Sequence, residues 1–195
     1  MSRPNRLKLG EELIQALLKK DLVEAETLLK AGAYLYTMVD KLTPILSCIS
    51  RTFEEGAILL LKYGFDINRP ITSDGFTPLH IATIEDNIQF IEFLLKKGAN
   101  IHAKSDSKYN ALRIAVGHKH RESVLLLLKY GADNDFQSRI EKGGKIEFGT
   151  MPNGWPLLSV TEPETHITPA KISDPIECTT EEEEDVDLTE YIITL

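Results

Sequence analysis

The side chains with the most reactive chemistry in this sequence are five histidines and two cysteines, Cys48 and Cys178. His118 and His120 stand in the pattern Gly-His-Lys-His-Arg, and a His-x-His pair is able to contribute to a metal site. A zinc ion needs about four ligands, however, and the sequence offers none that would complete this pair. We therefore predict no metal site and expect His120 to have a structural role.

Catalytic chemistry is not indicated either. Cys48 has no neighbouring base that would activate its thiol as a nucleophile. The pair Gly143-Gly144 alone does not make a phosphate-binding loop. The adjacent acids Glu85 and Asp86 are better explained as a solvated turn than as a general acid and base. We predict that the chain is not an enzyme and uses no cofactor.

The segments that carry these residues repeat along the chain. A Leu-Leu pair followed by a glycine recurs, with glycines 32, 34 and 33 residues apart, and a small residue recurs in the same register. The pairs and glycines are Leu28-Leu29 with Gly32, Leu60-Leu61 with Gly64, Leu94-Leu95 with Gly98, and Leu127-Leu128 with Gly131. The small residues are Ala16, Cys48, Ala82 and Ala115.

One repeat can be read as a turn and two short helices. Gly75 suits a turn because glycine adopts positive φ freely. Thr77 suits the N-cap of a helix that starts at Pro78, where a missing N–H costs nothing. Residues 88–95 then give the broad apolar face of a second helix, and Gly98 ends it. Neither helix can bury its apolar face alone, so such units must stack in an array.

These units resemble the ankyrin-repeat family, whose signature Thr-Pro-Leu-His-x-Ala matches residues 77–82 at the right period. The resemblance covers residues 10–135, with repeats at about 10–35, 36–69, 70–102 and 103–135. It implies an all-α solenoid of helix-turn-helix repeats with short β-hairpin fingers. The first repeat lacks the Thr-Pro start and is expected to cap the array. The signature residue His80 is expected to make local hydrogen bonds.

Residues 136–159 are predicted to be a C-terminal capping extension. The segment 139–148 is typical of a β-hairpin around Gly143-Gly144. Trp155, Leu157 and Leu158 would then cover apolar surface of the last repeat. A loose linker is the alternative that remains open.

From residue 160 the chain becomes rich in Pro, Glu, Ser and Thr, and we predict a disordered tail over 160–195. This tail holds eleven acids and one base, a charge of −10, whereas residues 1–159 carry +2. An acidic tail on a nearly neutral body argues against nucleic acid as the main partner, because phosphates would repel it.

The remaining composition favours the cytoplasm or the nucleus. No apolar run approaches the ~18 residues of a membrane helix. The N-terminus lacks the apolar core of a secretory signal, and two distant cysteines suggest no disulfide framework. We expect a monomer that binds neither a membrane nor nucleic acid.

Ankyrin-repeat proteins usually bind other proteins through finger tips and the concave face of their first helices, and this is what the resemblance implies here. Carried over position by position, the expected protein-binding residues are Val39, Asp40, Leu42, Ser50, Arg51, Ser73, Asp74, Phe76, Ile84, Glu85, Asp106, Ser107, Tyr109 and His118.

Phe76 and Tyr109 are the most informative members of this set. At finger positions that typically face solvent, exposed aromatic side chains would suit a binding hot spot. Leu42 at the equivalent position strengthens the pattern. The alternative is that these side chains pack on neighbouring fingers.

The tail and one loop offer modification and binding hypotheses. Thr179 and Thr180 precede acids, the spacing favoured by acid-directed kinases. Residues 191–195 are β-prone, so they could add to the edge of a partner's sheet, or the tail could compete with a partner for the body's own surface. Asn68 matches the loop asparagine that asparaginyl hydroxylases modify in this family.

The sequence therefore predicts a non-catalytic module that binds another protein, in an adaptor or scaffold role. An array followed by an acidic tail also resembles inhibitor-of-κB-like proteins. The alternative is thus a regulatory inhibitor of a transcription factor or of another defined partner.

Overall fold

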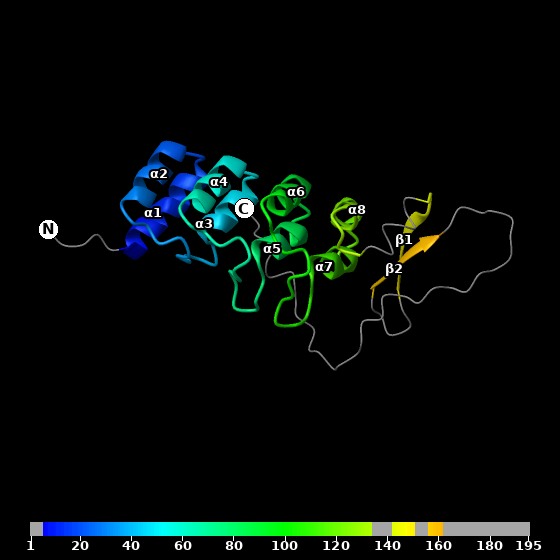
Figure 1. Ribbon diagram of the computed structural model, residues 1–195. Helices are drawn as coiled ribbons and strands as arrows, with labels where there is room; N and C mark the ends of the chain where they lie inside the picture. The colour runs from blue at the N-terminus through cyan, green and yellow to red at the C-terminus, as the bar shows by residue number, and fades with distance from the viewer. Residues whose placement is uncertain (1–5, 134–141, 151–155, 162–195) are drawn as a thin grey trace, which may run out of the picture.

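A computed structural model describes residues 6–133, 142–150 and 156–161. Within these ranges the chain forms helix pairs followed by two strands (Figure 1). The helices are α1 (Arg6–Leu18), α2 (Leu22–Lys30), α3 (Pro44–Ser50), α4 (Glu54–Lys62), α5 (Pro78–Ile84), α6 (Ile88–Lys96), α7 (Ala111–Gly117) and α8 (Arg121–Lys129); the strands are β1 (Lys145–Thr150) and β2 (Pro156–Thr161). No helix in the described ranges has both the length and the apolar character to cross a membrane.

The helix pairs stack side by side into an elongated array. The first helices of the pairs form an inner layer, in which α1 packs on α3, α3 on α5 and α5 on α7. The second helices form an outer layer, and the loops between pairs project as fingers from one side (Figure 1). The predicted all-α solenoid is confirmed.

Small residues let the inner helices approach closely. Ala16, Cys48, Ala82 and Ala115 are at most 1% exposed, as their shared register predicts. Burial also raises the pKa of the Cys48 thiol far above its usual value, which leaves it uncharged and inert.

His80 joins two consecutive repeats. The Thr77 N–H and hydroxyl both lie against the His80 Nδ1 atom, at 3.1 and 2.8 Å. On the other side of the ring, Nε2 lies 3.1 Å from the carbonyl oxygens of both Ala103 and Tyr109. A neutral ring protonated on Nε2 satisfies all four contacts, so the local hydrogen-bonding role predicted for His80 is confirmed.

The ends of the inner helices are also tied to the next repeat. Asn87 donates from Nδ2 to the Ile49 carbonyl and to the Thr52 hydroxyl, both at 2.9 Å. One repeat later, Ser123 donates to the Asp86 carboxylate at 2.6 Å. These bonds pair polar groups that stacking would otherwise bury unpaired.

The outer layer is joined differently. Glu26 on α2 accepts from Lys62 at 3.1 Å, and Glu92 on α6 accepts from the Tyr130 hydroxyl at 3.3 Å. At the equivalent position of α4 stands Ile58, which is 45% exposed. An open groove, lined by Ile58 and by Phe93 among others, separates α4 from α6.

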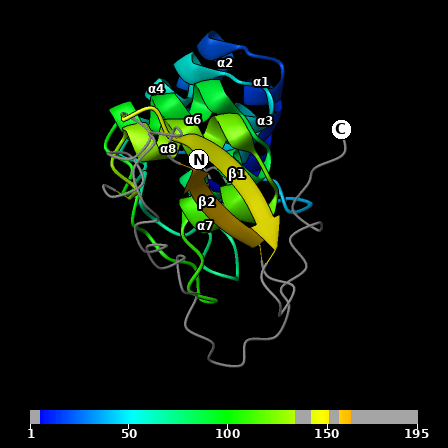
Figure 2. The same ribbon diagram turned by 90° about the vertical axis from the view of Figure 1, so that its right-hand side faces the viewer.

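The C-terminal strands form an antiparallel hairpin. β1 begins directly after Gly143-Gly144 and pairs with β2, with Phe148 opposite Leu158 (Figure 2). Gly143, at φ 92°, lies in the turn that leads into β1. The other strand of the hairpin predicted around Gly143-Gly144 falls on residues 139–141, which lie outside the described residues, so that hairpin stays a prediction.

This hairpin lies against the last helix pair. β2 contacts α7, and Leu158 is 3% exposed within the same apolar cluster as the repeats. β2 continues through Thr161, past the boundary predicted at residue 159. Trp155, Thr179 and Thr180, together with the rest of the predicted tail, lie outside the described residues. The capping role therefore stays a prediction.

The turns between paired helices yield a stability prediction. Lys119 is exposed and has φ 59°. This left-handed conformation costs a non-glycine residue about 1–2 kcal/mol. Lys119→Gly should raise the free energy of unfolding by roughly 0.5–1 kcal/mol, measured by urea denaturation. Thr52→Gly relieves the same strain but loses the Asn87 bond, so its gain should be smaller. A Lys119→Gly chain that is less stable than wild type would contradict this account.

Candidate protein-binding surface

Three fingers form the candidate surface. The first, residues 33–43, closes tightly because Val39 and Leu42 exchange backbone hydrogen bonds of 2.9 and 2.8 Å. The intervening Asp40 and Lys41 both have positive φ, 50° and 64°, as a type I′ turn requires. The turn places these two charged residues, both exposed, at the finger tip.

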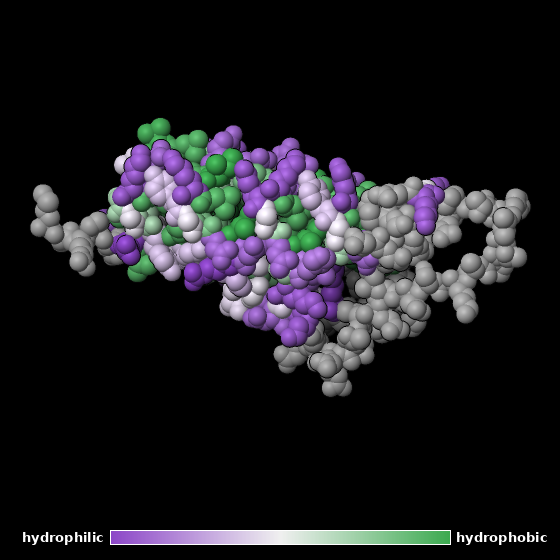
Figure 3. Space-filling view, viewed as in Figure 1, coloured by the Kyte–Doolittle hydropathy of each residue, from purple (hydrophilic) through white to green (hydrophobic). Residues whose placement is uncertain are grey.

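The second and third fingers, residues 66–77 and 100–110, support each other. In the second finger, Ile71 N–H donates to the Phe76 carbonyl at 2.8 Å, and in the third, Ser105 N–H donates to the Tyr109 carbonyl at 2.9 Å. Between them, Asp106 N–H donates to the carbonyl of Asp74 at 3.1 Å. The tips of these two fingers therefore hold a fixed spacing. Hydrophilic residues gather over them in the space-filling view (Figure 3).

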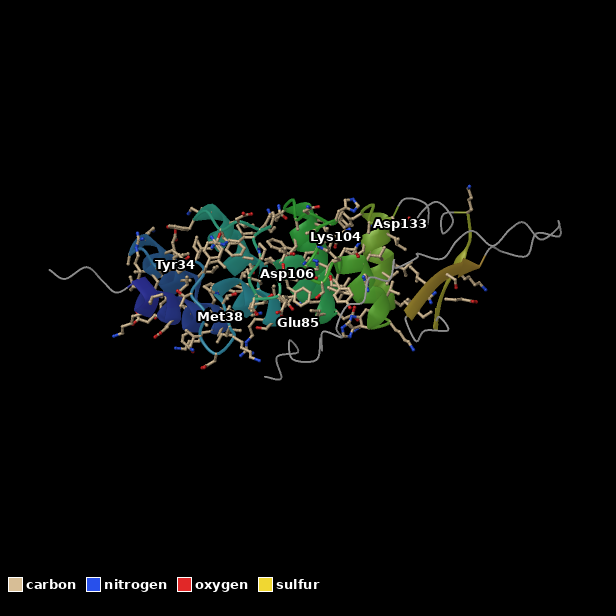
Figure 4. All side chains as sticks on the ribbon, turned by 90° about the horizontal axis from the view of Figure 1, so that it is seen from below. Tyr34, Met38, Glu85, Lys104, Asp106 and Asp133 are labelled. Atoms are coloured by element: carbon tan, nitrogen blue, oxygen red, sulfur yellow. The ribbon has the colours of Figure 1, made fainter. Side chains whose placement is uncertain are left out.

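The predicted binding residues divide into three groups by exposure. Four are exposed: Asp40, Arg51, Ser73 and Asp106. Seven are half-buried: Val39, Leu42, Ser50, Asp74, Glu85, Ser107 and His118. Three are buried: Phe76, Ile84 and Tyr109. Figure 4 follows the finger side from Tyr34 and Met38, through Glu85 and Asp106, towards Asp133.

The expectation that Phe76, Tyr109 and Ile84 offer exposed apolar contacts is wrong. Phe76 is 1% exposed because the second finger folds back and sets its ring 5.6 Å from that of His80. Tyr109 is 8% exposed, with the Arg113 guanidinium 4.1 Å from its ring centroid. Ile84 is 3% exposed because the whole of α5 is buried. These side chains belong to the core.

Two half-buried titratable groups at the ends of inner helices lack hydrogen bonds. Glu85 follows α5 and His118 follows α7, and neither Glu85 Oε1 nor His118 Nε2 has a partner. Burial raises the pKa of Glu85 to about 7. Burial, and then the neighbouring His120, lower the pKa of His118. Both groups are shifted toward their neutral forms, which suits them to contact with a protein surface.

Histidine and acidic side chains meet at the turns that follow α5 and α7. Within 6–133, 142–150 and 156–161, no three His, Cys, Asp or Glu side chains gather closely enough to hold a metal ion. The rings of His118 and His120 stack at 5.2 Å, and His120 Nδ1 lies 3.7 Å from Asp86 and 3.1 Å from the Thr83 carbonyl. The contact of His120 with the Thr83 carbonyl ties the turn after α7 to the preceding repeat, as the structural role expected of His120 requires.

Asn68 lies in an exposed loop, but its side chain is engaged. Its Oδ1 accepts the Asn100 N–H at 2.7 Å, and its Nδ2 donates to the Gly98 carbonyl at 3.3 Å. Tyr36 stands at the equivalent position of the preceding repeat, and its hydroxyl accepts the Asp66 N–H at 3.0 Å. Hydroxylation of Asn68 stays a prediction.

Sequence reasoning missed Tyr36 and its neighbour Arg69. Neither residue is among the binding residues expected from the sequence. Aligning the repeats on their glycines would have found Tyr36, because Tyr36 and Asn68 each follow the repeat glycine by the same interval. A large aromatic side chain where the next repeat has asparagine marks this boundary as different.

Comparisons with known proteins agree on one family. The family model described as ankyrin repeats (3 copies) matches residues 8–105 and 72–138. Inversin of Canis lupus familiaris is 32% identical over 97 residues, which is 50% of this chain and 9% of that protein. Ankyrin repeat protein nuc-2 of Neurospora crassa is 31% identical over 117 residues, 59% of this chain and 11% of that protein.

Ankyrin repeat and KH domain-containing protein mask-1 of Caenorhabditis elegans is 26% identical over 162 residues, 78% of this chain and 6% of that protein. The chain thus spans only about a tenth or less of each of these relatives. What the matches share is the repeat array.

The burial of Phe76 leads to a stability prediction. Phe76→Ala removes a ring that is 1% exposed, so it should lower the free energy of unfolding by about 3–5 kcal/mol in urea denaturation. Ser73→Ala, at an exposed position of the same finger, should change it by less than about 0.5 kcal/mol. Equal midpoints for Phe76→Ala and wild type would place the ring outside the core.

The raised pKa of Glu85 leads to a pH prediction. An acid whose folded pKa is raised from 4.5 to about 7 binds its proton more tightly in the folded chain, so its contribution to stability is lost as pH rises across this window. Glu85→Gln has no titratable carboxyl at this position, so the variant does not lose this stability as pH rises. Its unfolding midpoint should match wild type near pH 4, below this window, and exceed it near pH 8. A difference that does not change with pH would show that burial does not perturb this carboxyl.

Proposed function

The chain belongs to the ankyrin-repeat family, and we propose that it acts as a non-catalytic module that binds a partner protein through its fingers and the adjoining ends of its inner helices. A protein–protein interaction module is what this family of repeats implies. The proposed surface runs from the tip of the first finger, past the end of α3, to the joined tips of the second and third fingers. Its exposed charged members are Asp40, Arg51 and Asp106.

The observation that carries this choice of surface is the pairing of charges on the two sides of the array. On the outer helices, Glu26 bonds to Lys30 and Lys62, and Glu92 bonds to Lys96 at 2.9 Å. On the finger side, the side chains of Asp40, Arg51 and Asp106 make no ion pair in the described part of the chain. Unpaired charges at fixed positions are available to a partner of complementary charge.

The backbone supports the same surface. The Asp106–Asp74 bond and the tight turn at Asp40 fix the tips before a partner arrives, so little conformational entropy is lost on binding. Glu26 and Glu92 on the outer helices, by contrast, would have to leave their partners. The fingers are therefore favoured on both energetic and entropic grounds.

An adaptor or scaffold and a regulatory inhibitor would both use this surface. An adaptor holds two proteins at once, whereas an inhibitor of the kind resembled by repeats with an acidic tail occupies one partner and blocks its activity. We favour the adaptor. Phosphorylation of Thr179 and Thr180, hydroxylation of Asn68, and a cytoplasmic or nuclear location belong to the same proposal.

The test is affinity purification of full-length chains with quantitative mass spectrometry. Asp40→Lys, Arg51→Glu and Asp106→Lys are combined in one variant. The control reverses Lys129, Glu55 and Glu122, three exposed charged residues on the outer helices α4 and α8, with the same change in net charge. The partner's affinity, then measured by titration, should fall at least about tenfold in the finger variant and stay within about twofold in the control.

Either of two results would reject the proposal. A partner retained equally by both variants is not bound through the fingers, and a partner lost equally from both responds to general charge. If one chain bridges two captured proteins, the adaptor role stands; if it blocks the activity of a single tightly bound protein, the inhibitor role replaces it.

A further inference from the structure

A stack of three side chains crosses the boundary between the first two repeats. The Phe65 ring is buried, and the Tyr36 ring stacks on it with centroids 5.3 Å apart. The Arg69 guanidinium lies 4.1 Å from the centroid of Tyr36. Tyr34, labelled in Figure 4, is 42% exposed. Its ring meets that of Tyr36 edge-on, with centroids 5.8 Å apart. We call Tyr34, Tyr36 and Arg69 the arginine–tyrosine face.

Repeat stacking does not require this face. At the next boundary, Asn68 accepts the backbone N–H of Asn100, which is the bond that the Tyr36 hydroxyl makes with Asp66. A small amide is therefore sufficient to join two repeats. The aromatic ring and the arginine placed on it are additions at the first boundary.

The arginine is held in place but its donors are unused. Arg69 is exposed, and no residue in the described part of the chain accepts a hydrogen bond from its guanidinium or forms an ion pair with it. Stacking on Tyr36 restricts the side chain and leaves the N–H groups at the edge of the guanidinium plane open. A planar fork of this kind matches a carboxylate, which it binds through two parallel hydrogen bonds.

The charged residues around Arg69 do not prevent it from binding a further carboxylate. The Asp66 carboxylate already accepts the Asn68 N–H at 2.9 Å. A second cationic residue, Arg6, borders the face, since its carbonyl accepts the Tyr34 N–H at 3.4 Å. The exposed Tyr34 ring adds apolar area beside Arg69, and tyrosine with arginine is the composition found in hot spots.

We propose that the arginine–tyrosine face binds an acidic segment of a partner protein, with a carboxylate on Arg69 and an adjacent aromatic or aliphatic side chain on Tyr34. This inference rests on the proposed function and specifies the chemistry of the partner. The face lies at the first repeat boundary, so it extends the finger surface toward the N-terminal end of the array. A partner that contacts both the fingers and the arginine–tyrosine face would lie along the array.

The experiment selects peptides from a displayed library of random 16-residue sequences on the immobilised full-length chain. Selected peptides should combine at least one Asp or Glu with a nearby aromatic or aliphatic residue. Their affinity, measured by fluorescence anisotropy, should fall at least tenfold with Arg69→Glu and severalfold with Arg69→Lys, which keeps the charge but loses the fork. Arg121→Glu, at an exposed arginine at the start of the outer helix α8, is the matched control and should change the affinity less than twofold.

The outcomes separate this inference from the proposed function. Peptides without acidic enrichment, peptides insensitive to Arg69→Glu, or no selected peptides at all would each overturn the inference. The finger variant of the preceding subsection decides the proposed function independently. A severalfold gain in peptide affinity when Glu181–Glu184 are all replaced by Gln would instead assign the face to the chain's own acidic residues and also overturn the inference.

Discussion

Contact between neighbouring helix pairs is the constraint on which the rest of this structure depends. A pair of helices seven to nine residues long is too short to be stable alone and leaves one apolar side uncovered. The next pair covers that side, and the small residues at the Cys48 and Ala82 positions allow the approach. Every other feature, from the fingers to the turns, has to be compatible with this repeat-to-repeat packing.

Close packing creates buried polar groups at the helix ends, and the chain pairs them across repeats. His80 bonds to its own finger and to the next one, Asn87 bonds back to the preceding helix end, and Asn68 and Tyr36 each bond to the loop that follows. These bonds position the fingers as well as the helices. The binding surface is therefore fixed by the same bonds that hold the array together.

The repeat architecture could be predicted from the sequence because its determinants are local. Thr77, Pro78 and Gly98 mark where helices start and stop by their own backbone preferences. The direction of the Phe76 ring could not be predicted in this way, because it depends on a backbone bond across the finger and on contact with His80. The pairing of β1 with β2 was not predicted for a similar reason, since it joins residues on either side of the segment 151–155.

For the candidate surface, the exposure of charged finger residues could be predicted, whereas the exposure of apolar ones could not. Charged finger residues such as Asp40 and Asp106 remain exposed wherever the finger turns, because burying them unpaired would be costly. Apolar side chains of the fingers gain by turning inward, and Phe76 and Tyr109 do so. Family position alone therefore locates the fingers, while side-chain chemistry decides which finger residues a partner can reach.

The outer layer has a mechanical consequence. Polar bonds join α2 to the second repeat through Glu26 and join α6 to the fourth through Glu92, but Ile58 and an open groove lie between α4 and α6. The inner helices α3 and α5 remain packed at this boundary and Asn87 ties them, so they act as a pivot. We expect the outer layer to resist bending least at this boundary, and flexing about this pivot would change the curvature of the array and the distance between its first finger and the linked second and third.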